Sequence, residues 1–444
     1  MNKVTNRKDP EDTTLEVLYD VEEKPPFKEA VPLGLQHVLV MFSGNVSIPL
    51  ILAVSIGAPP ETRIFLVQAA LLVAGLATLV QALGIGPVGA RLPVVMGTSI
   101  GFVLVAIPIA QEYGLPAVFG GAVVAGVIQF IFGASIKRIR FLFPPLVAGI
   151  VVTIIGITVL PIGMNLAAGG AGSPDFGHPA NLALAGFVTL VIVVVNQFTR
   201  GFTGLIAILI GIAAGYLVAI PLGMVDFDII RDAEWFALPV PFQKGISFPL
   251  AAILGMGVMS IAVAIETIGD LAAITKSGAD REITAKELSG GLMGDGVGTA
   301  LASVFGALPN TSYSQNVGVV AFTGVMSRHV VAVGALFLIA FALIPKLGGV
   351  VSAMPAPVLG GAALIMFALV AVTGIKMLVE VRLNRRNMLI IAISLGVGLG
   401  MALVPESVRY FPRPVQAMLE TGIIQAAFLA IVLNLVLPDP EAKR

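Results

Sequence analysis

Long apolar stretches recur along almost the whole chain, and short polar or glycine- and proline-containing segments separate them. A helix needs about 20 mostly apolar residues to cross a bilayer, so the pattern predicts an all-α polytopic membrane protein with fourteen transmembrane spans. Two of these segments, 92–110 and 311–326, begin with proline and β-branched or polar residues and are poor continuous helices. The predicted spans are 32–56, 62–84, 92–110, 115–133, 144–167, 181–198, 202–222, 248–272, 287–305, 311–326, 329–344, 349–373, 387–404 and 419–437.

Composition supports lipid as the surrounding solvent. The chain is 57% hydrophobic and 12% charged, whereas an ordinary soluble domain is roughly 25% charged. The net charge is zero, so no basic field favours nucleic acid as a partner. Cysteine is absent, which excludes disulfides, thiolate metal sites and cysteine nucleophiles. No cofactor and no metal site is expected, and the chain lacks the short motifs of membrane-embedded hydrolases.

The polar stretches divide the chain and orient it. Residues 1–27 are predicted to be a cytoplasmic tail, followed by a first seven-span repeat, 28–222. An extracytoplasmic connector, 223–247, leads to a second seven-span repeat, 248–437, and a short cytoplasmic tail, 438–444. Loops on the side of the N-terminus hold 13 Lys and Arg residues and the opposite loops hold 6. The positive-inside rule therefore places both termini in the cytoplasm, and we expect a cell membrane, the inner one in a bacterium.

The two halves of the chain resemble each other. Leu92-Pro93 opens the third predicted span, and Leu308-Pro309 opens the tenth, 216 residues later. Seven spans is an odd number, so the second copy would enter the membrane inverted, as in many secondary transporters. The alternative to a repeat is that segments rich in Leu, Val, Gly and Ala resemble each other by chance. The broken segments at matching places in both halves favour the repeat.

Ionisable residues inside the predicted spans are the first candidates for function, because a charge within the membrane is costly. Glu266 lies more than a turn inside an apolar run, which favours a functional role. The alternative is a structural glutamate whose side chain reaches back to the membrane interface. Asp295 lies among glycines that allow close helix packing. Its carboxylate either accepts hydrogen bonds from neighbouring groups in a structural role or takes up and releases protons during transport. His37 either supports a site or is a buried histidine satisfied by a carbonyl. Asp270 is nearer the cytoplasmic end, and we interpret it as an interfacial carboxylate.

The tenth segment carries the most specific pattern. Its first part, 308–316, favours an extended chain, and the third segment has the same form at 93–99. The N–H and C=O groups of an extended backbone at membrane depth must form hydrogen bonds within the protein. The two segments could therefore pair as short antiparallel strands. The short helices that follow them would then direct their N-termini at one site. Gln315 and Asn316 each offer an amide donor and acceptor. Such an amide can pair with the N–H and C=O edge of an oxopurine, while Glu266 accepts a ring N–H.

These residues resemble those of a known family. The string from Gln315 to Gly324 is similar to the signature of the nucleobase-ascorbate transporters: Gln, Glu or Pro, then Asn-x-Gly, four variable residues, Thr, and Arg, Lys or Gly. Every fixed position is present. Further strings resemble their counterparts in the family, and the resemblance as a whole extends over residues 22–437. They are Gln36-His37, Gly97-Thr98-Ser99, Glu266 to Asp270, and Gly294-Asp295-Gly296.

The resemblance implies a fold and a set of roles. It implies fourteen spans, divided into a core domain (spans 1–4 and 8–11) and a gate domain (spans 5–7 and 12–14), in a homodimer with an elevator-like movement. It implies a nucleobase substrate and a co-transported proton, less readily sodium. By position, Glu266 and Gln315 would contact the base and Asp295 would assist coupling. Ser314 and the backbone near Ser99 would line the pocket, and Asn316 and His37 would support it.

The kind of base follows from one position. Purine members of the xanthine and uric acid type usually carry Gln at the position of Gln315, whereas uracil members usually carry Glu. Relatives often have Phe where this chain has Ile100, which weakens a claim of aromatic stacking. The expected function is proton-coupled import of xanthine or uric acid. The alternatives are a uracil permease, an anion transporter of the same architecture, and a membrane-embedded enzyme or ion channel.

Overall fold

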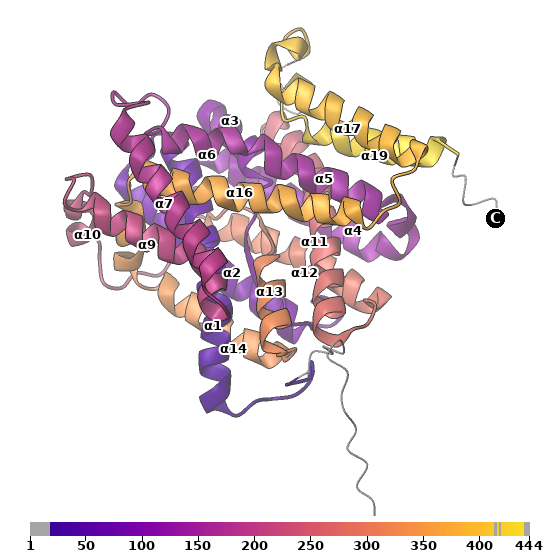
Figure 1. The fold of residues 1–444 in the computed structure, drawn as a ribbon, viewed down its shortest axis with the longest axis horizontal. Coiled ribbons are helices and arrows are strands. Elements are labelled where there is room, and N and C mark those ends of the chain that lie inside the picture. Colours follow the sequence, from indigo (N-terminus) through magenta and orange to yellow (C-terminus); the bar gives the residue numbers. More distant parts are fainter. Residues whose placement is uncertain (1–17, 413–414, 417–418, 439–444) are drawn as a thin grey trace, which may run out of the picture.

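The chain folds mostly into helices (Figure 1), together with two three-residue strands. The computed structural model describes residues 18–412, 415–416 and 419–438. The first half contains α1 (Phe27–Ser55), α2 (Pro60–Leu83), β1 (Met96–Thr98), α3 (Val103–Tyr113), α4 (Leu115–Ile139), α5 (Pro145–Thr158), α6 (Leu160–Ala167), α7 (Pro179–Phe198), α8 (Phe202–Leu205) and α9 (Ala207–Ala219). The second half contains α10 (Phe227–Asp232), α11 (Leu250–Ala279), α12 (Ala285–Phe305), β2 (Asn310–Ser312), α13 (Gln315–Thr323), α14 (Arg328–Ala342), α15 (Pro345–Ser352), α16 (Ala356–Val379), α17 (Arg385–Leu403) and α19 (Ile423–Val436).

Many of these helices have the length and apolarity of membrane spans. Within the described residues, eight helices pass both criteria, and a ninth is added if the bent pair α14 and α15 counts as one span. Three further apolar helices, α3, α9 and α19, have 10–17 residues each. The chain is therefore a multi-pass membrane protein. The fourteen predicted spans stay a prediction, because the shorter helices do not reach a full crossing by length alone.

Prolines explain where the helices depart from the predicted spans. The predicted span 144–167 corresponds to α5 and α6, which together count as one of the eight candidate spans, Pro145–Ala167, with a local interruption at Val159 before Pro161. The predicted start of the twelfth span at residue 349 was wrong, because α15 ends at Ser352 and α16 begins at Ala356 after Pro355. A proline is favoured in the first turn of a helix but interrupts its interior. The α15 helix is bent by 79° from α14.

The two broken segments pair as predicted. β1 and β2 form a two-stranded antiparallel sheet, with Met96 opposite Ser312 and Thr98 opposite Asn310. Each strand is buried along its whole length, so the ladder satisfies backbone groups that neither lipid nor a helix could satisfy. The helix α3 follows β1 and α13 follows β2. The pairing therefore ties two short helices to the opposite ends of one buried ladder.

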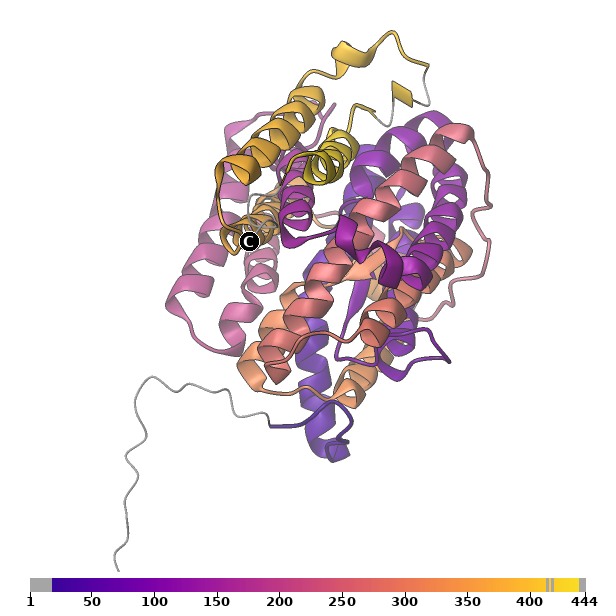
Figure 2. The same cartoon turned by 90° about the vertical axis from the view of Figure 1, so that its right-hand side faces the viewer.

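The helices pack in two groups. In the first group α4 lies against α11 and α12, and α14 lies against α1 and α2. In the second group α16 packs against α5, α6 and α7, and α9 packs against α7. The pair α17 and α19 packs against α5 and stands at the edge of the molecule (Figure 2). The strands belong with the first group, because they contact α1, α2, α11 and α12.

Close packing within the first group depends on glycine. A Cβ on Gly296 of α12 would lie 2.5 Å from the backbone nitrogen of Phe130 and 2.6 Å from the carbonyl oxygen of Gly126, both on α4. No side chain fits in that space, so α4 and α12 meet backbone to backbone. The neighbouring Asp295 is consequently held deep inside the first group, as the surrounding glycines predicted.

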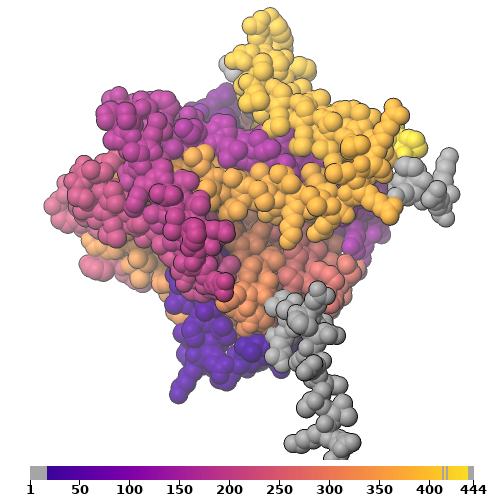
Figure 3. Space-filling view, in the orientation of Figure 1, coloured from indigo at the N-terminus to yellow at the C-terminus, as the bar shows by residue number. Residues whose placement is uncertain are grey.

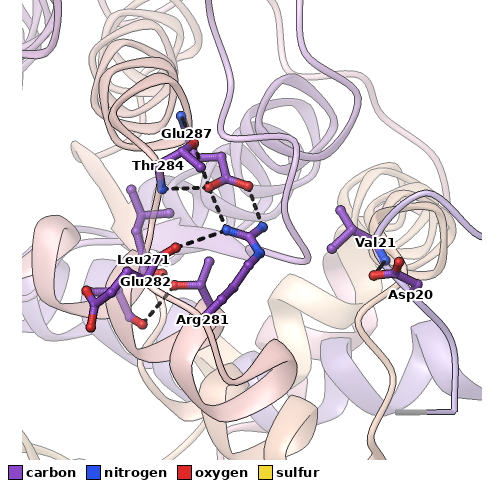
Figure 4. Close-up of polar contacts among 9 residues, drawn as sticks. Asp20, Val21, Leu271, Arg281, Glu282, Thr284 and Glu287 are labelled. Carbon is purple, nitrogen blue, oxygen red and sulfur yellow. Dashed lines mark hydrogen bonds and ion pairs between the residues drawn. The ribbon is translucent and has the colours of Figure 1, made fainter.

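The connection between α11 and α12 is fixed by a small polar network (Figure 4). Arg281 forms a salt bridge with Glu287 at 2.6 Å and also donates to the carbonyl oxygen of Glu282. Thr284 and Glu287 form a reciprocal capping box at the start of α12. Such a box satisfies backbone N–H groups that the first turn leaves free. The two helices that carry Glu266 and Asp295 are thus tied at their adjoining ends.

The part of the predicted N-terminal tail that is described lies against the protein. The Leu18 backbone N–H donates to the Gly324 carbonyl, and the Met326 N–H donates to the Tyr19 carbonyl. Glu22 forms a 2.7 Å salt bridge with Arg328, and the hydrogen bond from that guanidinium lowers the pKa of the Glu22 carboxyl. Residues 1–17 of the predicted N-terminal tail and 439–444 of the C-terminal tail lie outside the described residues.

Candidate substrate site

A cavity of about 280 Å³ lies between the two groups of helices. This volume is close to the lower end of the range for small-molecule sites, about 300–1,000 Å³. We call its first side the strand wall and its second side the α16 wall. The strand wall consists of Gly44, Ile48, Thr98, Ile100, Glu266, Thr311, Ser312, Tyr313, Ser314 and Gln315. The α16 wall consists of Val152, Met366, Leu369, Val370, Val372, Thr373 and Lys376.

The predicted base-contacting pair lies on the strand wall. Glu266 comes from the middle of α11 and is 8% exposed. Gln315 is the first residue of α13, and its side chain is half-buried. Among the described residues, the Glu266 Oε2 atom has no hydrogen-bond partner. A buried acceptor without a partner is costly, so the Glu266 carboxylate, which belongs to a residue of the cavity lining, keeps an unused capacity to accept a hydrogen bond.

Asp270 lies behind Ser314, and our interpretation of it as an interfacial carboxylate was wrong. The side chain is 5% exposed. Its Oδ2 atom accepts a hydrogen bond of 2.7 Å from the Ser312 hydroxyl, and its Oδ1 atom accepts one of 2.5 Å from the Ser314 hydroxyl. Asp270 therefore joins α11 to the end of β2 and the start of α13. It fixes the position from which Gln315 enters the cavity.

His37 and Asn316 contact each other beside the cavity rather than in its lining. The Asn316 amide nitrogen lies 3.0 Å from His37 Nδ1 and also donates to the His37 carbonyl at 3.1 Å. Because that amide nitrogen is a donor, Nδ1 is the acceptor in this pair. His37 is 1% exposed and Asn316 is fully buried. The pair joins α1 to α13, and the supporting role of both residues stays a prediction.

The chain around Ser99 contributes to the lining through its neighbours. Thr98 and Ile100 face the cavity, whereas the Ser99 side chain is fully buried outside the lining. The Ser99 N–H donates to the Pro309 carbonyl at 2.8 Å, which continues the strand pairing. The Tyr313 hydroxyl donates to the Thr98 carbonyl at 3.0 Å. Pairing therefore holds both short strands at the site.

Asp295 is fully buried and lies outside the cavity lining. Its Oδ2 atom accepts hydrogen bonds from the Thr267 hydroxyl at 2.8 Å and from the Gln129 amide at 3.3 Å. The Thr267 hydroxyl also lies 3.3 Å from that of Thr311, which does line the cavity. Asp295 is thus linked to the strand wall through two hydroxyl groups. Its Oδ1 atom has no hydrogen-bond partner among the described residues.

The site also includes residues that the sequence analysis did not select. Asn45 accepts hydrogen bonds from the Thr98 N–H at 2.8 Å and from its hydroxyl at 3.0 Å. Gln129 holds Asp295, and Tyr313 spans both strands. A lone amide inside an apolar run, as at positions 45 and 129, is the signal that could have identified two of them. Within the described chain, no group of three or more His, Asp or Glu residues could hold a metal ion.

The α16 wall is mostly apolar and comes almost entirely from one helix. All but Val152 of its residues lie on α16, which crosses the face of the molecule beside α7 (Figure 3). The Thr373 hydroxyl donates to the Leu369 carbonyl on the same helix at 2.9 Å. Only Lys376, in the last turn of α16, brings a charge to this wall.

Comparison with solved structures identifies the architecture. The transmembrane domain of the cyanobacterial bicarbonate transporter BicA matches 94% of this chain and all of that chain, with a TM-score of 0.56 and 13% identity. The murine anion transporter Slc26a9 in its inward-facing state matches 94% of this chain and 69% of that chain, with a TM-score of 0.63 and 13% identity. At this identity the likeness concerns the fold alone, which is that of a membrane transporter.

Comparison of sequences is more specific. A putative purine permease of Clostridium perfringens is 38% identical over 96% of this chain and 94% of its own length. The xanthine permease of Bacillus subtilis is 38% identical over 92% of this chain and 94% of its own. The uric acid transporter UacT of Escherichia coli is 38% identical over 90% of this chain and 84% of its own. The model of the Permease family (Xan_ur_permease) matches residues 28–407. The chain is therefore a permease rather than an enzyme, and it belongs to the nucleobase-ascorbate transporter family.

Proposed function

We propose that this protein is a secondary active transporter that imports xanthine, uric acid or both by proton symport. One observation carries the proposal: Glu266 and Gln315 line the same wall of one cavity, and the Glu266 Oε2 atom has no hydrogen-bond partner among the described residues. Relatives named as xanthine and uric acid permeases support the same substrate class. The substrate-binding residues would be Glu266, Gln315 and Ser314, with Ser99, Asn316 and His37 in support.

The recognition chemistry follows from donors and acceptors. The Gln315 amide forms a bidentate pair with the N–H and C=O edge of an oxidised purine. Glu266 accepts a ring N–H in a charge-assisted hydrogen bond. Adenine and cytosine carry amino groups where these partners need a carbonyl, and leaving a buried polar group unpaired costs about 1–3 kcal/mol. The site should therefore select an oxidised base against an amino-substituted one.

Proton coupling is supported by three buried carboxylates. Glu266, Asp270 and Asp295 are at most 8% exposed, and none of them forms a salt bridge among the described residues. A buried carboxylate without a cation is costly. A proton that enters with the base would remove a charge from this cluster through Glu266 or Asp295. Sodium coupling is the less supported alternative, because the described carboxylates do not form a metal cluster.

The elevator-like mechanism rests on the two helix groups. In this proposal the first group, with the strand wall, moves as the core domain against the second, as the gate domain. Fourteen spans in an inverted 7+7 repeat, a homodimer, and both termini in the cytoplasm of a cell membrane belong to the same proposal. The symmetric position of β1 and β2 supports the repeat, because each strand precedes a short helix in its own half.

A uracil permease and an anion transporter of this architecture are the remaining alternatives. The Gln315 amide disfavours uracil, because uracil members of the family usually carry a carboxylate at that position. A small inorganic anion offers no ring N–H to the Glu266 carboxylate and no N–H and C=O edge to the Gln315 amide, so these two groups favour a base. The solved structures of bicarbonate and anion transporters share the fold alone.

The test is uptake of radiolabelled xanthine by cells that express the protein, with unlabelled purines and pyrimidines as competitors. We expect xanthine and uric acid to compete far better than adenine, cytosine and uracil, and we expect the label to accumulate chemically unchanged. Adenine that competes as well as xanthine would refute the purine specificity. A protonophore should abolish accumulation, whereas persistence that depends on sodium would refute proton symport.

A further inference from the structure

The α16 wall carries a single charge that the proposed base contacts do not use. Lys376 is the only Asp, Glu, Lys, Arg or His residue in α16, and it lines the cavity with an exposed side chain. The helices α5, α6, α7 and α9 pack against α16 and contain none of these residue types. The helix α1 also touches α16, and its Lys28, Glu29 and His37 lie outside the cavity lining.

In the described part of the chain, no protein group pairs with the Lys376 ammonium. Among the described residues, no hydrogen bond or salt bridge involves Lys376. The other ionisable groups in the lining are Glu266 and Tyr313, and the Tyr313 hydroxyl is bound to the Thr98 carbonyl. Lys376 and Glu266 face one cavity from opposite walls without forming a salt bridge. The lining of this cavity therefore contains one carboxylate and one ammonium group.

Oxidised purines differ in the charge that they bring to such a cavity. Uric acid loses its first proton below neutral pH, xanthine does so only at higher pH, and the two are otherwise similar in shape. An anionic base beside the Glu266 carboxylate would be repelled, and a cation on the facing wall would offset that repulsion. The partial exposure of the cavity weakens the attraction but does not remove it.

We propose that Lys376 is a specificity-determining residue whose ammonium recognises the negative charge of an ionised base, so that the cavity favours the urate anion over a neutral purine of the same shape. The inference rests on the proposed function, because it presupposes that an oxidised purine lies against Glu266 and Gln315. It adds the ionisation state of the ligand as a determinant of selectivity. The α16 wall then takes part in recognition as well as in closing the site.

The experiment measures affinity for uric acid and for xanthine on purified protein at two pH values. At the higher pH uric acid is ionised and xanthine is mostly neutral, and at the lower pH both are neutral. Lys376→Met removes the charge and keeps the length of the side chain, and Lys376→Arg keeps the charge. Lys286→Met is the matched control, because Lys286 is an exposed lysine on α12 outside the cavity.

We expect Lys376→Met to weaken urate binding at the higher pH by about tenfold, as for the loss of a charge-assisted contact. In Lys376→Met, the affinity for xanthine at the higher pH and the affinity for uric acid at the lower pH should change little. Lys376→Arg and Lys286→Met should bind both purines as the wild type does. An unchanged ratio of urate to xanthine affinity in Lys376→Met would overturn this inference and leave the proposed function standing. Wild-type protein that binds neither purine would overturn both.

Discussion

The two walls of the cavity hold their polar groups in different ways. On the strand wall, Ser312 and Ser314 are bound to Asp270, and Thr98 is bound to Asn45. On the α16 wall, the Thr373 hydroxyl bonds only within its own helix. No hydrogen bond in the described part of the chain joins an α16 side chain to the strand wall. The difference is that hydrogen bonds to neighbouring elements hold the polar groups of the strand wall, whereas the α16 wall meets the cavity mainly through apolar side chains.

The largest expected effect is on the coupling of base uptake to protons, and it follows from a change at Asp295, which lies behind the strand wall. Asp295→Asn should abolish accumulation of the base and leave its binding largely intact, because Asp295 lies outside the cavity lining. The variant should fold, since the new amide can donate to Gln129 Oε1, which has no partner among the described residues. The measurement compares ligand affinity on purified protein with uptake into vesicles under a proton gradient. A loss of binding as severe as that of Glu266→Gln would show that our division into binding and coupling residues is wrong.

A smaller effect is expected for the contact on the strand wall itself. Glu266→Gln keeps the shape of the side chain but removes the charge that assists the hydrogen bond from the base. Such bonds contribute about 1.5–3 kcal/mol, so affinity for xanthine should fall by roughly tenfold or more. Thr373→Val on the α16 wall is the control, because its hydroxyl is occupied by the Leu369 carbonyl. Equal losses in the two variants would remove the distinction between the walls.

The smallest expected effects are on stability, and they differ between the two walls because their side chains are packed differently. A Cβ on Gly97 of β1 would lie 2.5 Å from a ring carbon of Tyr313 and 3.0 Å from Asn45 Oδ1. Gly97→Ala should therefore lower the free energy of unfolding by about 1–3 kcal/mol, the usual cost of overpacking. Leu369 on the α16 wall is 46% exposed, so Leu369→Ala should change stability less. Thermal unfolding of both variants in detergent tests this order, and a more stable Gly97→Ala protein would contradict it.

Residue chemistry made much of the site predictable. The proline at the start of each broken segment and the polar run from Asn310 to Gln315 predicted two paired strands, and the pairing is confirmed. Gln315, Ser314 and Glu266 share one cavity as expected. The rarity of ionisable groups in apolar runs was sufficient for Glu266, whereas Gln315 was assigned from its amide chemistry and the family signature, and Ser314 from the resemblance alone.

Tertiary packing explains what the sequence analysis missed. Asp270 looked interfacial because it is four residues nearer the cytoplasmic end than Glu266, but α11 continues to Ala279 and keeps it buried. Lys376 lies three residues beyond the predicted span 349–373 and was one of the 13 loop cations counted on the side of the N-terminus, because the sequence does not tell which helix end borders a cavity. The start of α16 depended on how Pro345 and Pro355 divide the chain, and two prolines so close together allow several helix boundaries.

The β1–β2 ladder also has a consequence for how the protein is made. The Thr98 carbonyl and the Tyr313 hydroxyl that bind each other are 215 residues apart, so translation delivers β1 long before its partner. Extended backbone cannot remain unsatisfied in lipid, and nascent chains emerge at about 5–20 residues per second. For many seconds the first strand must therefore wait in water, in the insertion machinery or against a temporary neighbour. A ribosome-bound chain truncated before residue 310 should lack the central site altogether, however many of its helices have already entered the membrane.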